Sequence, residues 1–169
     1  MGIFTTALNN LRDLYLDTIK RSLSSERQIA DKGLPAMIEK ATNQQLADAF
    51  RTHLVETRHH IVRLERILDA AAGEADDIRC KVTAALLSAA DASINGASSD
   101  ALRDVVLIAA GNQIEHHEIA VYGTLRTWAQ ILGESQDAAL FDKTLQEEES
   151  ADDLLSQLSG QINGVAVAA

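Results

Sequence analysis

Residues 101–122 read ALRDVVLIAAGNQIEHHEIAVY and carry the strongest structural signal in the chain. Wrapped at about 100° per residue, this run leaves no wide polar face, and a helix that is apolar on every side is a buried helix. Glu115, His116, His117 and Glu118 nevertheless stand in its middle. Burying such groups costs several kcal/mol each unless they are paired, neutralised or bound to a cation. The run therefore predicts a buried helix whose polar groups meet partners on other helices.

The composition predicts one helical domain. Of 169 residues, 46% are hydrophobic and 24% are charged, and there is only one Pro, which is typical of a globular protein rich in helix formers. No apolar run is long enough to predict a membrane span. The net charge of −10 argues against nucleic acid as a partner, because phosphate binding needs clustered Lys and Arg. The N-terminal residues do not have the basic segment followed by an apolar run that is typical of a secretion signal. The single cysteine, Cys80, fits a reducing compartment, so we expect a cytoplasmic protein.

Turn and capping signals divide the chain into six expected helices. Gly33 is expected to end the first helix in a left-handed conformation, with Pro35 as a stop signal. Thr42 and Gln45 have the spacing of a capping box, and Gly133 is expected to end the buried helix. The bundle is expected to occupy residues 1–160, with a flexible C-terminal tail at 161–169. The expected helices are 6–32, 35–41, 42–73, 76–94, 100–132 and 135–158.

This order of elements predicts the architecture. Two long hairpins joined by a crossover that itself contains a helix are typical of an all-α, ferritin-like four-helix bundle with two additional short helices. A generic antiparallel bundle is the alternative, because periodicity alone fits both.

Each long helix carries at least one Glu on or near its apolar stripe. Glu26 and Glu148 fall on the stripes of the first and last long helices, Glu56 lies at the margin of its stripe, and Glu115 and Glu118 share a face at i, i+3. Glu56, Glu115 and Glu148 lie at similar heights on the second, third and fourth long helices, roughly 20–24 Å from the helix start. Facing helices that each supply a Glu predict a carboxylate-bridged di-metal site. An oxygen-rich ligand set favours iron or manganese.

The histidine ligand has two candidates. Glu56 and His59 spell Glu-x-x-His, a pair that di-iron bundles use, whereas helical periodicity favours His60, one turn beyond Glu56. Glu148 and Asp152 form a parallel pair on the last helix. Taken singly, these acids also fit surface ion pairs or a solvated acidic run. It is their coincidence at one height that favours a metal site.

Four stretches carry a resemblance to a known family: SERQ at 25–28, HLVET at 53–57, QIEHHEIAVYGTL at 113–125 and LQEEESAD at 145–152. On these residues the chain resembles the YciE/YciF-type family of bacterial ferritin-like proteins, over about residues 5–160. The resemblance implies a compact ferritin-like bundle, dimerisation and an association with stress responses. It implies ligand positions at Glu26, Glu56, Glu115, Glu118 and Glu148. Family members vary at 58–60, so it does not choose between the two histidines.

Two functions from different classes are expected. The first is a protein that binds two irons per chain, or manganese, and oxidises Fe(II) with O2 or peroxide. In this function Tyr122 is a hydrogen-bond donor to the site or a redox-active neighbour of it. The second is a structural or interaction homodimer in which the metal site is only stabilising or vestigial. An iron-storage shell is a third reading. The sequence does not decide whether the metal turns over, so enzymatic activity is left open.

Overall fold

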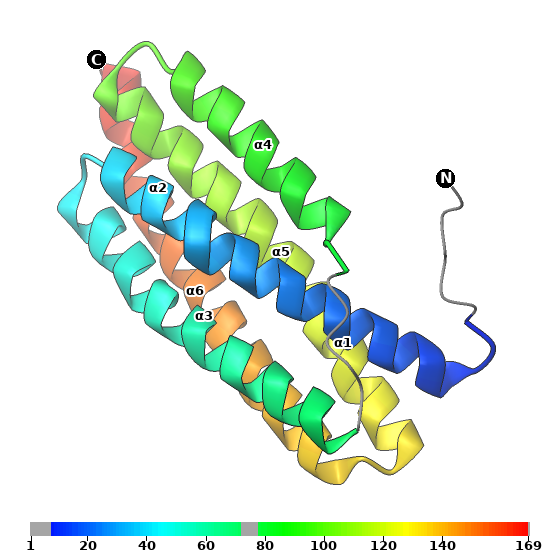
Figure 1. Ribbon diagram of the computed structural model, residues 1–169. Helices are drawn as coiled ribbons and strands as arrows, with labels where there is room; N and C mark the ends of the chain where they lie inside the picture. Colours follow the sequence, from blue (N-terminus) through cyan, green and yellow to red (C-terminus); the bar gives the residue numbers. More distant parts are fainter. Residues whose placement is uncertain (1–7, 72–77, 169) are drawn as a thin grey trace, which may run out of the picture.

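The computed structural model describes residues 8–71 and 78–168, and every regular element among them is a helix (Figure 1). The first long segment combines α1 (Leu11–Gln28), a π-helical turn (Ile29–Gly33) and α2 (Leu34–Lys40). The other long segments are α3 (Gln44–Ala70), α5 (Asp100–Leu132) and α6 (Ser135–Ala168), and α4 (Lys81–Gly96) lies outside them (Figure 1). The predicted all-α, ferritin-like four-helix architecture is confirmed.

The four long segments follow one another around the bundle in the order α1, α3, α6 and α5. Helix α1 packs on α3 and α5, and α6 packs on the same two helices from the opposite side. Helix α4 packs on α5 and α1. It belongs to the connection from α3 to α5, so the predicted crossover does contain a helix.

The first segment does not break at Gly33, and this part of the prediction is wrong. Gly33 has a φ of −61°, which is right-handed helical backbone, and the Leu34 amide donates to the Ile29 carbonyl in π-helical register. Pro35 therefore sits inside a continuing segment at the start of α2. A Cβ on Gly33 would lie 2.7 Å from Leu87 Cδ2 of α4. Gly33 thus permits the close approach of α4, a constraint set by a distant helix.

The capping residues also differ at one point from the prediction. Asn43, and not Thr42, caps α3 by accepting from the Leu46 amide. Thr42 binds the buried Asp104 of α5 instead, through its amide at 2.8 Å and its hydroxyl at 2.6 Å. This contact fixes the α2–α3 connection to α5. The predicted end of α5 is confirmed, since Gly133 has a φ of +79°.

Several predicted helix ends lie elsewhere. Helix α6 continues to Ala168 and does not end near Leu158, and its Ile162 is buried. Helix α1 begins at Leu11 after the Asn10 cap. The predicted boundaries at residues 6, 73 and 76 lie outside the described residues.

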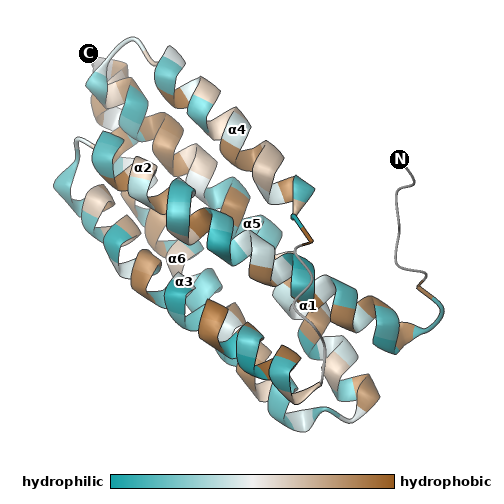
Figure 2. Cartoon of the chain, in the orientation of Figure 1, coloured by the Kyte–Doolittle hydropathy of each residue, from teal (hydrophilic) through white to brown (hydrophobic). Residues whose placement is uncertain are grey.

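The apolar core is divided in two along the bundle axis. One cluster contains Phe50 and Leu107, among others, and the second contains Phe141 and Leu125. A layer of buried polar side chains from all four long segments separates them. Figure 2 shows that each helix carries both apolar and polar residues along its length.

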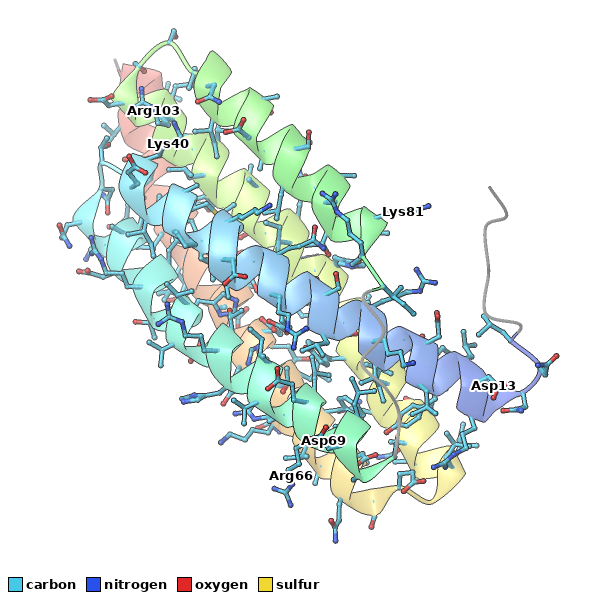
Figure 3. The ribbon with its side chains drawn as sticks, in the orientation of Figure 1. Asp13, Lys40, Arg66, Asp69, Lys81 and Arg103 are labelled. Carbon is cyan, nitrogen blue, oxygen red and sulfur yellow. The ribbon has the colours of Figure 1, made fainter. Side chains whose placement is uncertain are left out.

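Helix α5 is buried on one side only, which corrects the expectation that it is enclosed all round. Its outer side carries small and polar residues such as Ala109, Gln113 and Thr124, which are exposed. Alanine counts as apolar in the hydrophobic pattern, but its side chain can remain exposed, because its small apolar area contributes little free energy when buried. Charged side chains such as Arg66 and Lys81 extend from the outside of the bundle (Figure 3). None of the described helices is long and apolar enough to cross a membrane.

Candidate metal centre

Two groups of ligand-type side chains meet in the polar layer between the apolar clusters. Within each group, one candidate ligand atom from every residue lies within 4.8 Å of the others. Glu148 belongs to both groups, so the two candidate positions share a carboxylate. The first group is His53, Glu115, Glu118 and Glu148, and the second is Glu26, His60 and Glu148.

Helical periodicity explains why these residues converge. His53 and His60 are seven residues apart on α3, about two turns, so they face the same direction. Glu115 and Glu118 are three apart on α5 and are neighbours on its surface. Glu26 of α1 and the shared carboxylate of α6 complete the set, so each of the four long helical segments contributes.

Most of the converging atoms have no hydrogen-bond partner among the described residues, although all are buried. His60 Nδ1 lies 3.0 Å from Glu148 Oε1 and 3.4 Å from Glu26 Oε1. His53 Nε2 lies 3.3 Å from oxygens of both Glu115 and Glu148. Atoms left this way are costly unless something binds them. The unpartnered atoms in this layer are Glu26 Oε2, His53 Nε2, His60 Nδ1, Glu115 Oε2, Glu118 Oε2 and both oxygens of Glu148.

The second ring nitrogen of each histidine lies within hydrogen-bonding distance of a carboxylate outside the layer. His60 Nε2 lies 2.9 Å from Glu147, and His53 Nδ1 lies 3.3 Å from Glu56. If these outer nitrogens carry the protons, the inner nitrogens present lone pairs to the two groups. Glu147 is itself held by two hydrogen bonds from Arg63. Such carboxylate–histidine pairs are a usual means of orienting metal ligands.

Two further contacts position the carboxylates. Tyr122 Oη donates to Glu26 Oε1, and Ser25 Oγ donates to Glu118 Oε1 at 3.3 Å. Burial raises the pKa of the Tyr122 phenol well above its ordinary value, so this group keeps its proton and remains a donor. Tyr122 therefore has the position of a hydrogen-bond donor to a candidate ligand.

Without a cation, protons must balance the buried charges. Burial raises the pKa values of Glu115 and Glu118 well above the ordinary range. Burial lowers the pKa values of the two histidines, but the facing carboxylates outweigh it and raise them to about 9 for His53 and about 11 for His60. Burial also opposes ionisation of Glu148, yet the histidines lower its pKa overall. In the metal-free protein, protons thus neutralise carboxylates and imidazoles whose oxygen and nitrogen atoms are suited to binding cations.

The structure brings together five of the seven predicted site residues: Glu26, His60, Glu115, Glu118 and Glu148. It places the other two differently. Glu56, whose side chain is 32% exposed, lies behind His53 and belongs to neither group. His59 is exposed and points away from the layer. Between the two candidate histidines, the geometry therefore favours His60.

Sequence reasoning missed His53 and Glu147 as members of the site. His53 stands on the inward stripe of α3 with His60, so its spacing was an available signal. Glu147 lies beside the stripe of α6, and only the position of Arg63 and His60 on α3 shows its role. Asp152 is not in either group and pairs with the exposed His116 at 2.9 Å.

Comparison with known proteins gives consistent matches over nearly the whole chain. The model of the family described as a domain of unknown function, DUF892, matches residues 10–167. Protein YciF of Escherichia coli (strain K12) is 31% identical over 159 residues, which cover 94% of this chain and 94% of that protein.

Two solved structures share the fold. The crystal structure of the E. coli stress protein YciF has a TM-score of 0.88 at 30% identity, covering 93% of this chain and 99% of that chain. YcfI from Rhodopseudomonas palustris, proposed to be a structural protein, has a TM-score of 0.86 at 31% identity, covering 91% and 98%.

Proposed function

This chain belongs to the DUF892 family, and we propose that it binds two divalent metal ions, iron foremost, in the buried His–Glu layer and oxidises Fe(II) with O2 or peroxide. The stress protein of E. coli that it resembles supports an association with stress responses. We place the protein in the cytoplasm as a homodimer, and size-exclusion chromatography with light scattering tests the oligomer.

One observation carries the proposal. Seven buried ligand-type atoms that have no hydrogen-bond partner in the described part of the chain belong to two groups of residues that share Glu148. An apolar layer of the same volume would cost less to bury, since buried charges rarely repay their desolvation by mutual attraction. A pair of cations gives all of these atoms partners at once.

The charges and donor types favour iron or manganese. Glu26, Glu115, Glu118 and Glu148 carry four negative charges when ionised, and two divalent ions with neutral imidazoles balance them. Thiolates, which select softer metals, are absent from both groups. Four carboxylates with two imidazoles form the donor set that bundle proteins use for iron or manganese pairs.

The surrounding residues have definite tasks in this function. When bound, two irons supply the electrons that reduce O2 or peroxide. Glu147 and Arg63 hold the His60 ring with its inner nitrogen toward Glu148. Tyr122 stabilises Glu26 as an oriented carboxylate by donating to it. The buried layer limits the water that reaches the site.

The test is elemental analysis of protein produced without a metal-affinity tag in cells supplied with iron and manganese. We expect about two ions per chain, and Glu148→Gln should lose both because its carboxylate is shared. Glu149→Gln is the matched control, because Glu149 is the exposed neighbour. Metal at background level in folded wild-type protein would overturn the proposal.

A structural role is the second candidate, supported by the description of YcfI as a proposed structural protein. In that case a cation bound only by the native state would stabilise the joint between four helices and undergo no redox change. A chelator would then lower the melting temperature, while Fe(II) addition would consume no oxygen. Oxygen consumption by the wild type that Glu148→Gln abolishes would exclude this candidate.

A further inference from the structure

A groove of about 290 Å³ runs between the first long segment and α4. Helix α4 packs there on α1 and on the π-helical turn. None of the residues that line the groove belongs to the two groups of the metal centre. The volume lies at the lower end of the range for small-molecule sites and corresponds to roughly ten water-sized groups. The groove is therefore a candidate site separate from the metal centre.

Two hydrogen bonds between the first segment and α4 lie at the ends of the groove. At one end Gln28 Nε2 donates to the Cys80 carbonyl at 3.1 Å. At the other end Lys40 Nζ donates to Asn95 Oδ1 at 3.1 Å. From Gln28 to Lys40 the first segment rises about 18 Å at about 1.5 Å per residue. The groove is thus elongated, and its shape suits an extended chain better than a compact ring.

The floor of the groove is apolar. Met37 of α2 is 3% exposed and Ile94 of α4 is 4% exposed, and both line the groove. Ala36, Ala84 and Leu87 also line it and are half-buried. These half-buried side chains present apolar surface to the solvent. A ligand with an apolar body would remove this surface from water, which stabilises a complex.

The charged residues of the groove reverse the charge balance of the chain. The whole chain has 15 Lys and Arg against 25 Asp and Glu, whereas three cations and one acid line the groove. The acid, Asp91, accepts from Asn95 at 3.0 Å, and Asn95 in turn accepts from Lys40. Lys32 and Arg79 form no hydrogen bond or ion pair with another described residue. Two cations of the groove are therefore available to a ligand.

Lys32 and Arg79 belong to the same end of the groove. Lys32 lies about one turn beyond Gln28, and Arg79 directly precedes Cys80, which contacts Gln28. Lys32 is part of the π-helical turn, a rare conformation that is frequent at functional sites. An ammonium and a guanidinium at one place bind a carboxylate through charge-assisted hydrogen bonds. The opposite end is less suited, because its lysine already donates to a neighbour and its acid repels an anion.

We propose that this groove binds one molecule of a medium-chain fatty acid. The carboxylate lies between Lys32 and Arg79, and the hydrocarbon chain follows the apolar floor toward Ile94. An acid of about eight carbons has about ten non-hydrogen atoms, which matches the volume of the groove. A two-chain lipid exceeds this volume, and a cationic amphiphile meets charge of the wrong sign. This binding goes beyond the proposed metal function, because it involves no residue of the metal centre.

The test is a titration of the full ¹⁵N-labelled chain with octanoate, followed by two-dimensional ¹H–¹⁵N NMR. We expect saturable shifts of amides that line the groove, Gly33 and Leu87 among them, and none at Glu148. Hexanoate should bind about two- to fourfold more weakly for each methylene removed. Octyltrimethylammonium has a chain of the same length but the opposite charge. It should bind about tenfold more weakly, because two attractions become repulsions.

Three variants and a control locate the ligand. Lys32→Gln and Arg79→Gln should each weaken octanoate binding about two- to fivefold. Ala36→Leu places a larger side chain in the groove and should abolish the shifts, and leucine is nearly as good a helix former as alanine. Lys81→Gln is the matched control. Lys81 is exposed at the first turn of α4 and does not line the groove (Figure 3).

Several outcomes would overturn the proposal. Absence of saturable shifts at the groove would do so, as would equal affinities for octanoate and octyltrimethylammonium. Shifts that appear only with vesicles of an anionic two-chain phospholipid would assign the groove to a membrane surface instead. A dimer by light scattering whose groove amides do not respond to octanoate would assign the groove to a second copy of the chain. Metal content enters none of these outcomes, so a chain that binds octanoate but no metal would overturn only the metal function.

Discussion

Glu148 Oε1 lies 3.0 Å from His60 Nδ1, and neither side chain is exposed to solvent. The second oxygen of Glu148 lies 3.3 Å from His53 Nε2. One carboxylate therefore faces both buried imidazoles, which carry protons at neutral pH in the absence of metal because their pKa values are raised to about 9 and about 11.

Glu148→Gln is expected to lower the free energy of unfolding of the metal-free protein by about 3 kcal/mol, because it leaves buried imidazolium groups without their shared carboxylate. Urea unfolding in the presence of a chelator measures the change. Glu149→Gln should leave the unfolding midpoint unchanged. Equal midpoints for the two variants would show that the buried charges do not interact as described.

The metal-free protein should lose stability as pH rises above about 5. His53 and His60 have raised pKa values in the folded state, so their stabilisation is full below the unfolded value of 6.5 and is lost as pH rises through about 9 and about 11. Glu115 and Glu118 act in the same direction, because the folded chain holds their protons above 4.5, where the unfolded chain releases them. Urea unfolding at pH 6 and pH 9 tests this.

Bound metal should reverse that trend. Because the cation displaces protons from the histidines and carboxylates, affinity rises with pH and adds stability at the alkaline end. The metal-loaded protein is therefore expected to be more stable at pH 8 than at pH 6 by thermal unfolding. A loaded protein with the same pH dependence as the metal-free form would contradict the proposed ligands.

Variants on the unshared carboxylates should divide the site. Glu118→Gln affects only the group that contains His53, and Glu26→Gln only the group that contains His60. Each is expected to retain about one metal ion per chain, whereas Glu148→Gln retains none. Elemental analysis of the three proteins, purified in parallel, distinguishes two sites from one. Loss of all metal in both single-group variants would indicate one cooperative site.

Glu147→Gln should weaken metal binding about tenfold without changing the number of ions bound at saturation. The substitution disturbs the carboxylate that orients His60 and accepts from Arg63, and such outer contacts contribute this much to affinity. Titration of metal-free protein with Mn(II), followed by calorimetry, measures the affinity. Glu134→Gln at the end of the bundle, where Glu134 pairs with Arg12, is the control.

Site residues could be predicted from the sequence where the pattern that identifies them lies within a single helix. Glu26, Glu115, Glu118 and Glu148 could be placed because a stripe with period 3.6 fixes which residues of a helix face the core. The choice of His60 over His59 rests on the same reasoning. The assignment of Glu147 needed the lateral position of Arg63 on another helix, which no spacing within α6 contains.

The fold shows the same limit. Turn chemistry at Gly133 was local, and the predicted helix end was correct. Gly33 is also a glycine, but it does not end a helix. A glycine fits at this position because Leu87 of α4 packs closely against it. Helix α5 was predicted to be enclosed because small residues were counted as apolar, although one face lies in solvent.

The hydroxyl groups of Thr83 and Ser25 join Cys80 to Glu118 in a single row that crosses from α4 through α1 to α5. A hydroxyl has one hydrogen to donate. If Thr83 donates to the sulfur, Ser25 donates to Thr83 and Glu118 receives nothing. If Ser25 turns to Glu118, Thr83 can turn to Ser25 and the sulfur loses its donor. The two hydroxyl groups thus have two hydrogens for three contacts, and the third contact is complete only when the Cys80 thiol or the Glu118 carboxyl supplies its own proton.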